Sequence, residues 1–183
     1  MALRNLVRTI STSSRFRPIP GGGCLPRQNL FLLNQDIARI CRDYQHLDTI
    51  NLARASLAAY VKYVNPPDWT NYIQYSSNKY TKIQVIPPLS NAYSIYLLNW
   101  LPGQSSPIHG HPPGGCVMGV LCGALEETIY PSCKPLTYRY KDIHVLTPGK
   151  IGYITDTIGY HRIANLCNAP CNSLHIYFHN PPH

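Results

Sequence analysis

The chain has 183 residues and a formal net charge of +8, from 16 Lys and Arg against 8 Asp and Glu. This length predicts a single domain, and 17 prolines in a chain that is only 13% charged exclude a long helical bundle or a coiled coil. The sequence contains no run of 18 apolar residues that would indicate a membrane span, so we expect no membrane partner.

Residues 1–33 are predicted to form a basic leader, because they contain no acidic residue and hold five of the arginines. A cationic start with Ser and Thr is typical of a mitochondrial transit peptide, and a disordered basic tail is the alternative. We expect a cytoplasmic protein. The alternative is the mitochondrial matrix, because of this leader without acidic residues. The Lys and Arg beyond Asp36 are dispersed, which argues against a nucleic-acid partner.

Two or three short helices are predicted between residue 34 and about residue 78. The first begins at Asn34, whose side chain can cap it, and continues with apolar residues at helical spacing. The second runs from about Thr49 to Val64 and is ended by Asn65-Pro66-Pro67. A third, over residues 69–75, is shorter.

After about Tyr80 the pattern changes to short segments rich in Val, Ile, Tyr and Thr, separated by Gly, Pro and Asn. This spacing is typical of an all-β sandwich or barrel. We predict a mainly β protein, an antiparallel β-barrel preceded by the helices. The predicted strands are 81–86, 93–100, 115–122, 124–130, 151–155, 160–166 and 173–178.

The chain contains seven cysteines and eight histidines. The cysteines include no C-x-x-C pair, which excludes a zinc ribbon, and their odd number argues against a disulfide framework. Cys167 and Cys171 are four residues apart in a turn that contains Pro170. They could hold a metal or be ordinary turn and strand-end residues.

The histidines carry the more specific pattern. His109 and His111 are two apart, so in an extended segment both imidazoles project to one face. Gly103 lies six residues before His109, and Gly123 lies seven after Cys116. This spacing resembles the first signature of the cupin superfamily, except that Cys116 stands where that signature has a metal-binding glutamate.

A second, weaker match to the cupin pattern consists of Gly159, His161 and Asn165. Three neutral imidazoles from two strands are enough to hold a divalent first-row metal and leave open positions. With no carboxylate ligand the metal keeps its full dipositive charge and favours an anionic ligand such as a thiolate. The alternative is that these histidines only pack and hydrogen-bond.

The sequence resembles the cysteine dioxygenase family of cupins from about Asn34 to Pro182, so residues 34–183 are expected to form one thiol dioxygenase domain with a jelly-roll barrel. The resemblance rests on S-S-P-I-H-G-H, on the Cys five residues later, and on G-A-L-E-E-T, D-T-I-G-Y-H-R-I-A-N and S-L-H-I-Y. It implies a non-haem enzyme with one Fe(II) per subunit. The implied reaction adds both atoms of O2 to L-cysteine and gives cysteine sulfinic acid (3-sulfinoalanine), in cysteine catabolism towards hypotaurine and taurine.

Residue by residue, the resemblance implies three iron ligands: His109, His111 and His161. It implies a thioether link between Cys116 and Tyr177, which would hold the phenol at the open coordination position. Ser173 and His175 alternate with Tyr177, so a Ser-His-Tyr hydrogen-bond relay is expected on one strand face.

Two departures affect the expected substrate pocket. Lys82, in Tyr80-Thr81-Lys82, stands where the family has an arginine that pairs with the substrate carboxylate, and a lysine lacks the planar fork that grips both oxygens. Residues 178–180 are an insertion behind Tyr177. The expected partners are a small thiol and O2. Lys82 and Tyr80 are the expected substrate-binding residues. The protein is expected to be a monomer. The alternatives are a dioxygenase of 3-mercaptopropionate or cysteamine, and a metal-binding cupin without catalytic activity.

Overall fold

A computed structural model describes residues 29–44, 47–131, 140 and 142–180. Helices α1 (Leu30–Asp43) and α2 (Leu47–Tyr63) come first, followed by a single 3-10 helix, η1 (Asp68–Tyr72). The strands that follow are β1 (Thr81–Ile86), β2 (Tyr93–Trp100), β3 (Cys116–Cys122), β4 (Leu125–Tyr130), β5 (Asp142–Leu146), β6 (Ile151–Ile154), β7 (Tyr160–Ala164) and β8 (Cys171–Phe178).

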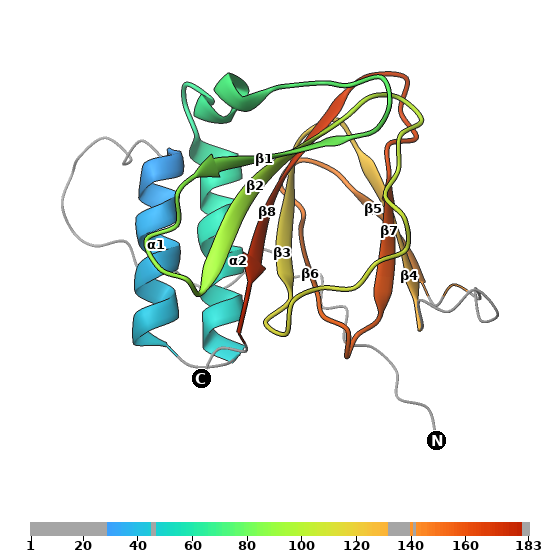
Figure 1. The fold of residues 1–183 in the computed structure, drawn as a ribbon. Helices are drawn as coiled ribbons and strands as arrows, with labels where there is room; N and C mark the ends of the chain where they lie inside the picture. The colour runs from blue at the N-terminus through green and yellow to red at the C-terminus, as the bar shows by residue number, and fades with distance from the viewer. Residues whose placement is uncertain (1–28, 45–46, 132–139, 141, 181–183) are drawn as a thin grey trace.

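The strands form two antiparallel sheets that face each other, and both helices pack on the outside of the larger one (Figure 1). The larger sheet has the order β1-β2-β8-β3-β6, and the smaller has the order β5-β4-β7. The prediction of a mainly β protein with antiparallel strands preceded by helices is confirmed. None of the helices in the described part of the chain is long and apolar enough to cross a membrane.

Strand alternation divides the interior into two cores. In β8, Leu174, Ile176 and Phe178 pack against the helices, whereas Cys171 and Tyr177 face the smaller sheet. Ser173 and His175 share the second face by the same alternation and are buried. The helices therefore cover one face of β8, and the polar residues of that strand are directed between the sheets.

The predicted start of the first helix is wrong. Asn29, not Asn34, caps α1, because its side chain accepts a hydrogen bond from Leu32 N at 2.8 Å. Asn34 is buried inside the helix, where its side-chain oxygen accepts a 2.6 Å bond from the Tyr93 hydroxyl. Residues 29–33 of the predicted leader thus begin α1, and residues 1–28 lie outside the described part.

The seven predicted strands are all present, with ends that differ by up to two residues. The eighth strand, β5, was missed because it has only five residues and two of them, Asp142 and His144, are polar; its Ile143 and Val145 are exposed, while His144 is partly buried. The third predicted helix is η1, which ends at Tyr72 and not at residue 75.

Candidate metal centre and substrate cavity

His109 and His161 are held together by their backbones. The segment before β3 runs along the edge of β7, and each of the two histidines donates its N–H to the carbonyl of the other, at 3.0 and 3.1 Å. The segment is anchored further along by Ser106, whose N–H donates to Ile163 O and whose hydroxyl accepts from Ile163 N. One imidazole therefore comes from a strand of the smaller sheet and the other from its edge.

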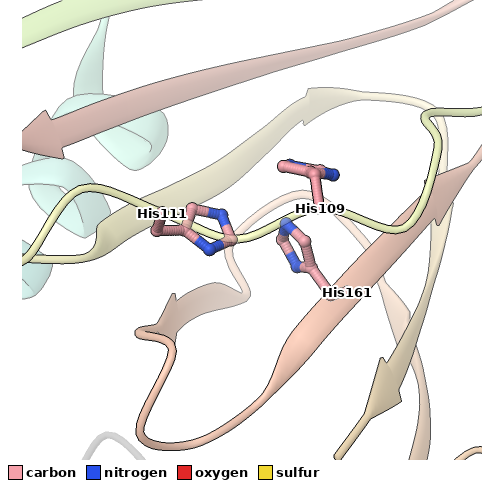
Figure 2. A group of neighbouring side chains, drawn as sticks. All are labelled: His109, His111 and His161. Atoms are coloured by element: carbon pink, nitrogen blue, oxygen red, sulfur yellow. The ribbon is translucent and has the colours of Figure 1, made fainter. Parts of the chain in front are cut away.

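The three predicted metal ligands converge. One ring nitrogen from each of His109, His111 and His161 lies within 4.8 Å of the others. Figure 2 shows the rings turned toward a common point, and the ring centroids are 4.5 to 5.1 Å apart. Among the described residues this is the one group of three or more His, Cys, Asp or Glu with such geometry.

The remaining ring nitrogens test whether the group fits a metal. His161 Nδ1 donates to Glu127 Oε1 at 2.7 Å, and His109 Nδ1 donates to Pro107 O at 3.0 Å, so each has its Nε2 left. Both ring nitrogens of His111 are buried and have no hydrogen-bond partner in the described residues. A buried imidazole without any partner is costly, and a metal bond removes that cost. The donor set fits a divalent cation.

The surroundings of His111 and His161 lower their pKa values and favour the neutral form that a metal ligand needs. Burial, and then the neighbouring histidines, lowers the pKa of His111 to about 3. Burial, followed by His109, lowers the pKa of His161 to about 3 as well. Burial raises the pKa of Glu127 to about 7, although the nearby His144 opposes this.

Gly110 allows the two histidines of the segment to approach β7. The Asp156 carboxylate accepts a 2.7 Å bond from His111 N. A Cβ on Gly110 would lie 2.7 Å from that carboxylate and 2.9 Å from the Tyr160 ring. A side chain at this position would therefore have to displace the Asp156 carboxylate, which holds the His111 N–H, and the Tyr160 ring.

Ser173 and His175 are hydrogen-bonded, but the relay differs from the expected one. Trp100 Nε1 donates to Ser173 Oγ at 3.0 Å, and Ser173 Oγ is hydrogen-bonded to His175 Nε2 at 2.9 Å. His175 Nδ1 then faces Cys116 Sγ at 3.7 Å. His175 and Tyr177 are stacked with centroids 6.0 Å apart and have no hydrogen bond among those of the described residues. The Tyr177 link stays a prediction.

Cys116 and Tyr177 are directly opposite each other on β3 and β8. Side chains at such paired positions have Cβ atoms about 4.5–5.5 Å apart. Both belong to the core between the sheets, and burial raises the pKa of the thiol and of the phenol. The register brings the two residues together, as a thioether would need.

A cavity of about 270 Å³ opens beside His109 and contains both predicted substrate-binding residues. Tyr80 stacks on Trp100 with centroids 4.3 Å apart. Lys82 remains exposed on β1, and its Nζ lies 3.9 Å from the ring centroid of Tyr177. Partial burial lowers the Lys82 pKa, and Cys116 opposes this. No described residue that lines the cavity is a carboxylate.

Three side chains of the site were not predicted. Glu127 lies in G-A-L-E-E-T, a motif that the resemblance marked without giving it a role. Trp100 supports Ser173, and its sequence signal was only that of a buried strand residue. His179, in the insertion behind Tyr177, lines the cavity and has its Nε2 2.8 Å from Ser94 Oγ.

The sequence is similar to that of known proteins. The family model described as cysteine dioxygenase type I matches residues 34–183. Cysteine dioxygenase type 1 of Rattus norvegicus is 31% identical over 152 residues, covering 80% of this chain and 74% of the relative. The Homo sapiens protein of the same name is 30% identical over 152 residues, with the same coverage of each chain.

The fold is also found among solved structures. An uncharacterized conserved protein with a double-stranded beta-helix domain from Klebsiella pneumoniae matches with a TM-score of 0.50 and 18% identity, over 62% of this chain and 89% of that one. This likeness shows that the two facing antiparallel sheets have the fold of a double-stranded β-helix domain. Because the family model covers most of the chain and the site has the geometry described above, the chain belongs to the cysteine dioxygenase type I family and is a dioxygenase.

Proposed function

We propose that this protein is an Fe(II)-dependent cysteine dioxygenase, which converts L-cysteine and O2 into cysteine sulfinic acid in cysteine catabolism towards hypotaurine and taurine. The observation that carries the proposal is the three-imidazole group, of which His109 lines a cavity that also holds Lys82 and no carboxylate among its described residues. The family membership supports a small-molecule substrate and O2 as the reactants.

His109, His111 and His161 would hold one iron per chain. When bound, the iron supplies the Lewis acidity and the redox chemistry that a thiol and O2 require. The ligand set is neutral, so it leaves the positive charge of the cation available to attract a thiolate. Glu127 orients His161 by accepting its Nδ1–H, which fixes the tautomer with a free Nε2.

Lys82 would bind the substrate carboxylate. Its ammonium lies over the rings of Tyr96 and Tyr177, 4.4 and 3.9 Å from their centroids, at the cavity wall. The charge attracts an anionic substrate and disfavours a cationic one such as cysteamine. Tyr80 lines the same cavity and is the second proposed substrate-binding residue.

Tyr177 would act as a proton donor beside the metal ligands. Its ring is stacked with that of His111, with centroids 6.3 Å apart, and its raised pKa keeps the phenol protonated at neutral pH. A thioether to Cys116 would fix the ring and lower that pKa. Ser173, bonded to Trp100, holds His175 against the Cys116 sulfur.

Oxygen uptake with Fe(II)-loaded protein tests the function. We expect uptake with L-cysteine and formation of the sulfinate, and we expect His161→Ala to lose both iron and turnover. Uptake with 3-mercaptopropionate or cysteamine, and none with cysteine, would identify another thiol dioxygenase. A protein that binds iron and consumes no O2 with any of the three thiols would be a metal-binding cupin without catalysis.

The crosslink is tested by mass. A Cys116–Tyr177 thioether removes two hydrogens, a loss of about 2 Da that a reductant does not reverse, unlike a disulfide. We expect this loss in the wild type after turnover with cysteine and Fe(II), and none in Tyr177→Phe. An unchanged wild-type mass after many turnovers would exclude the link.

We also propose a monomer in the cytoplasm, with the mitochondrial matrix as the alternative compartment. The composition of residues 1–33 supports the alternative, because it contains arginine without any acidic residue. The N-terminal sequence of the protein isolated from its cells distinguishes the two, since import removes a transit peptide.

A further inference from the structure

Three cysteines that are not part of the three-histidine group lie near one another. Cys122 ends β3, Cys171 begins β8, and Cys167 lies in the turn that joins β7 to β8. The Sγ atoms of Cys167 and Cys171 both lie within hydrogen-bond distance of the same acceptor, Ala124 O, at 3.4 and 3.3 Å. The shared acceptor holds the two sulfur atoms on the same side of the turn.

Asn165 clamps the turn in this shape. Its side-chain oxygen accepts from Cys167 N at 2.9 Å and from Cys171 Sγ at 3.1 Å, while its Nδ2 donates to Ala169 O at 2.9 Å. The amide thus fixes the backbone at one cysteine and the thiol of the other. The pairing is a property of the folded turn and not only of the spacing in the sequence.

Gly123 leaves space for the Cys171 sulfur because it has no side chain. Gly123 has a positive φ of 79°, and a Cβ there would collide with Cys171 Sγ. Within the described residues the cysteines form no group of three or more ligands with metal-binding geometry.

We propose that Cys167 and Cys171 are a redox-active dithiol, which low-molecular-weight disulfides oxidise to an intramolecular disulfide. The Cys167 thiolate attacks one sulfur of the reagent and displaces one thiolate, leaving a mixed disulfide. Cys171 then attacks the Cys167 sulfur and displaces the second thiolate. Two electrons pass to the reagent, and the two protons of the protein thiols end on the two released thiols.

The two thiols differ in access, which sets their order in the reaction. Cys167 is partly exposed, whereas Cys171 is fully buried. Burial is the main reason that the pKa of Cys171 is raised to about 11, with Cys167 and Cys122 adding to the shift. A reagent therefore meets Cys167 first, and Cys171 completes the bond inside the protein.

The experiment treats the full-length, iron-loaded protein with glutathione disulfide, then blocks free thiols with N-ethylmaleimide and digests with trypsin. Cleavage after Arg162 places Cys167 and Cys171 in one peptide, residues 163–183, which also contains Tyr177 and stays joined to the Cys116 peptide in molecules that have formed the proposed thioether. We expect this peptide to lose both sites of alkylation and about 2 Da. Dithiothreitol should restore both sites, which distinguishes the disulfide from the irreversible thioether at Tyr177.

Matched variants locate the bond. Cys167→Ser keeps a hydroxyl donor for Ala124 O and should abolish the oxidation, whereas Cys41→Ser, in α1, should leave it unchanged. Retention of both alkylation sites in the wild type at the highest glutathione disulfide concentration would overturn the proposal. So would loss of the oxidation in Cys122→Ser, because the bond would then join Cys122 to Cys171. A glutathione adduct without the internal bond would also overturn it.

Discussion

Glu127 should control metal affinity through one hydrogen bond. Its carboxylate is 7% exposed and accepts from His161 Nδ1 at 2.7 Å. Above pH 7, where the carboxylate is ionised although burial raises its pKa to about 7, Glu127→Gln keeps an oxygen of the same size in this position and removes the charge. A charged acceptor is worth about 1–2 kcal/mol more than a neutral one, which corresponds to a loss of roughly 5- to 30-fold in metal affinity.

The same substitution should change the stability of the metal-free protein little. It removes a buried charge, which favours the folded state, and it leaves a buried amide N–H to be satisfied, which disfavours it. Each effect is worth about 1–3 kcal/mol and the two have opposite signs. We therefore expect the metal-free Tm to move by only a few degrees while the metal affinity falls.

The assay is a competition between the protein and a chromophoric chelator for Fe(II) under anaerobic conditions, with thermal unfolding of the metal-free protein measured in parallel. Glu126→Gln is the matched control, because Glu126 precedes Glu127 on β4 and alternation directs it to the other face. Metal affinity within twofold of the wild type in Glu127→Gln would refute the reasoning. A large fall in Tm would instead assign Glu127 a packing role.

Two further predictions concern the approach of the histidines and the substrate. Gly110→Ala should lower metal affinity by at least about 10-fold, since the new Cβ would lie 2.7 Å from the Asp156 carboxylate. Gly152→Ala is the control and should leave metal affinity unchanged, because its Cβ would have no neighbour nearer than 3.4 Å. Lys82→Met should lower kcat/KM for cysteine by about 10- to 100-fold, the worth of one hydrogen bond to a charged group, and should not lower that for cysteamine, because it removes a charge that disfavours a cationic thiol. Equal losses for both thiols would show that Lys82 does not bind the carboxylate.

The sequence predicted most strands because their signal is local. Segments such as β1 and β2 are bounded by Gly, Pro or Asn and rich in β-branched and aromatic residues, so their ends agree with the structure. β5 was missed because it has only five residues and two of them, Asp142 and His144, are polar, which leaves a weak local signal; its Ile143 and Val145 are exposed at the edge of the smaller sheet. Asn34 was misassigned because a buried amide inside a helix has the same local signal as a cap.

The histidine group was predictable for a different reason. His109, His111 and His161 fall at spacings that a family resemblance marks, so their convergence needed no knowledge of the packing. Glu127 was not predictable in this way, because its contact with His161 joins residues 34 positions apart and depends on the pairing of β4 with β7. The hydrogen bond from Trp100 to Ser173 also depends on the β2–β8 register, which the sequence does not give. In that register Trp100 is paired with Cys171 and Ser173 with Leu98.

Cys116 stands where the cupin signature has a metal-binding glutamate, and the position of Glu127 explains what this change does to the charge of the site. A glutamate ligand would place a negative charge directly on the metal, and Cys116 is instead a buried thiol with a raised pKa, which is neutral at pH 7. The carboxylate that the site does contain lies on the far side of the His161 ring, where it strengthens a ligand without neutralising the cation. Together with Lys82 at the cavity wall, this arrangement keeps the cavity side of the site positive. Such a site selects a substrate that brings its own negative charges, a thiolate and a carboxylate, over one that is cationic.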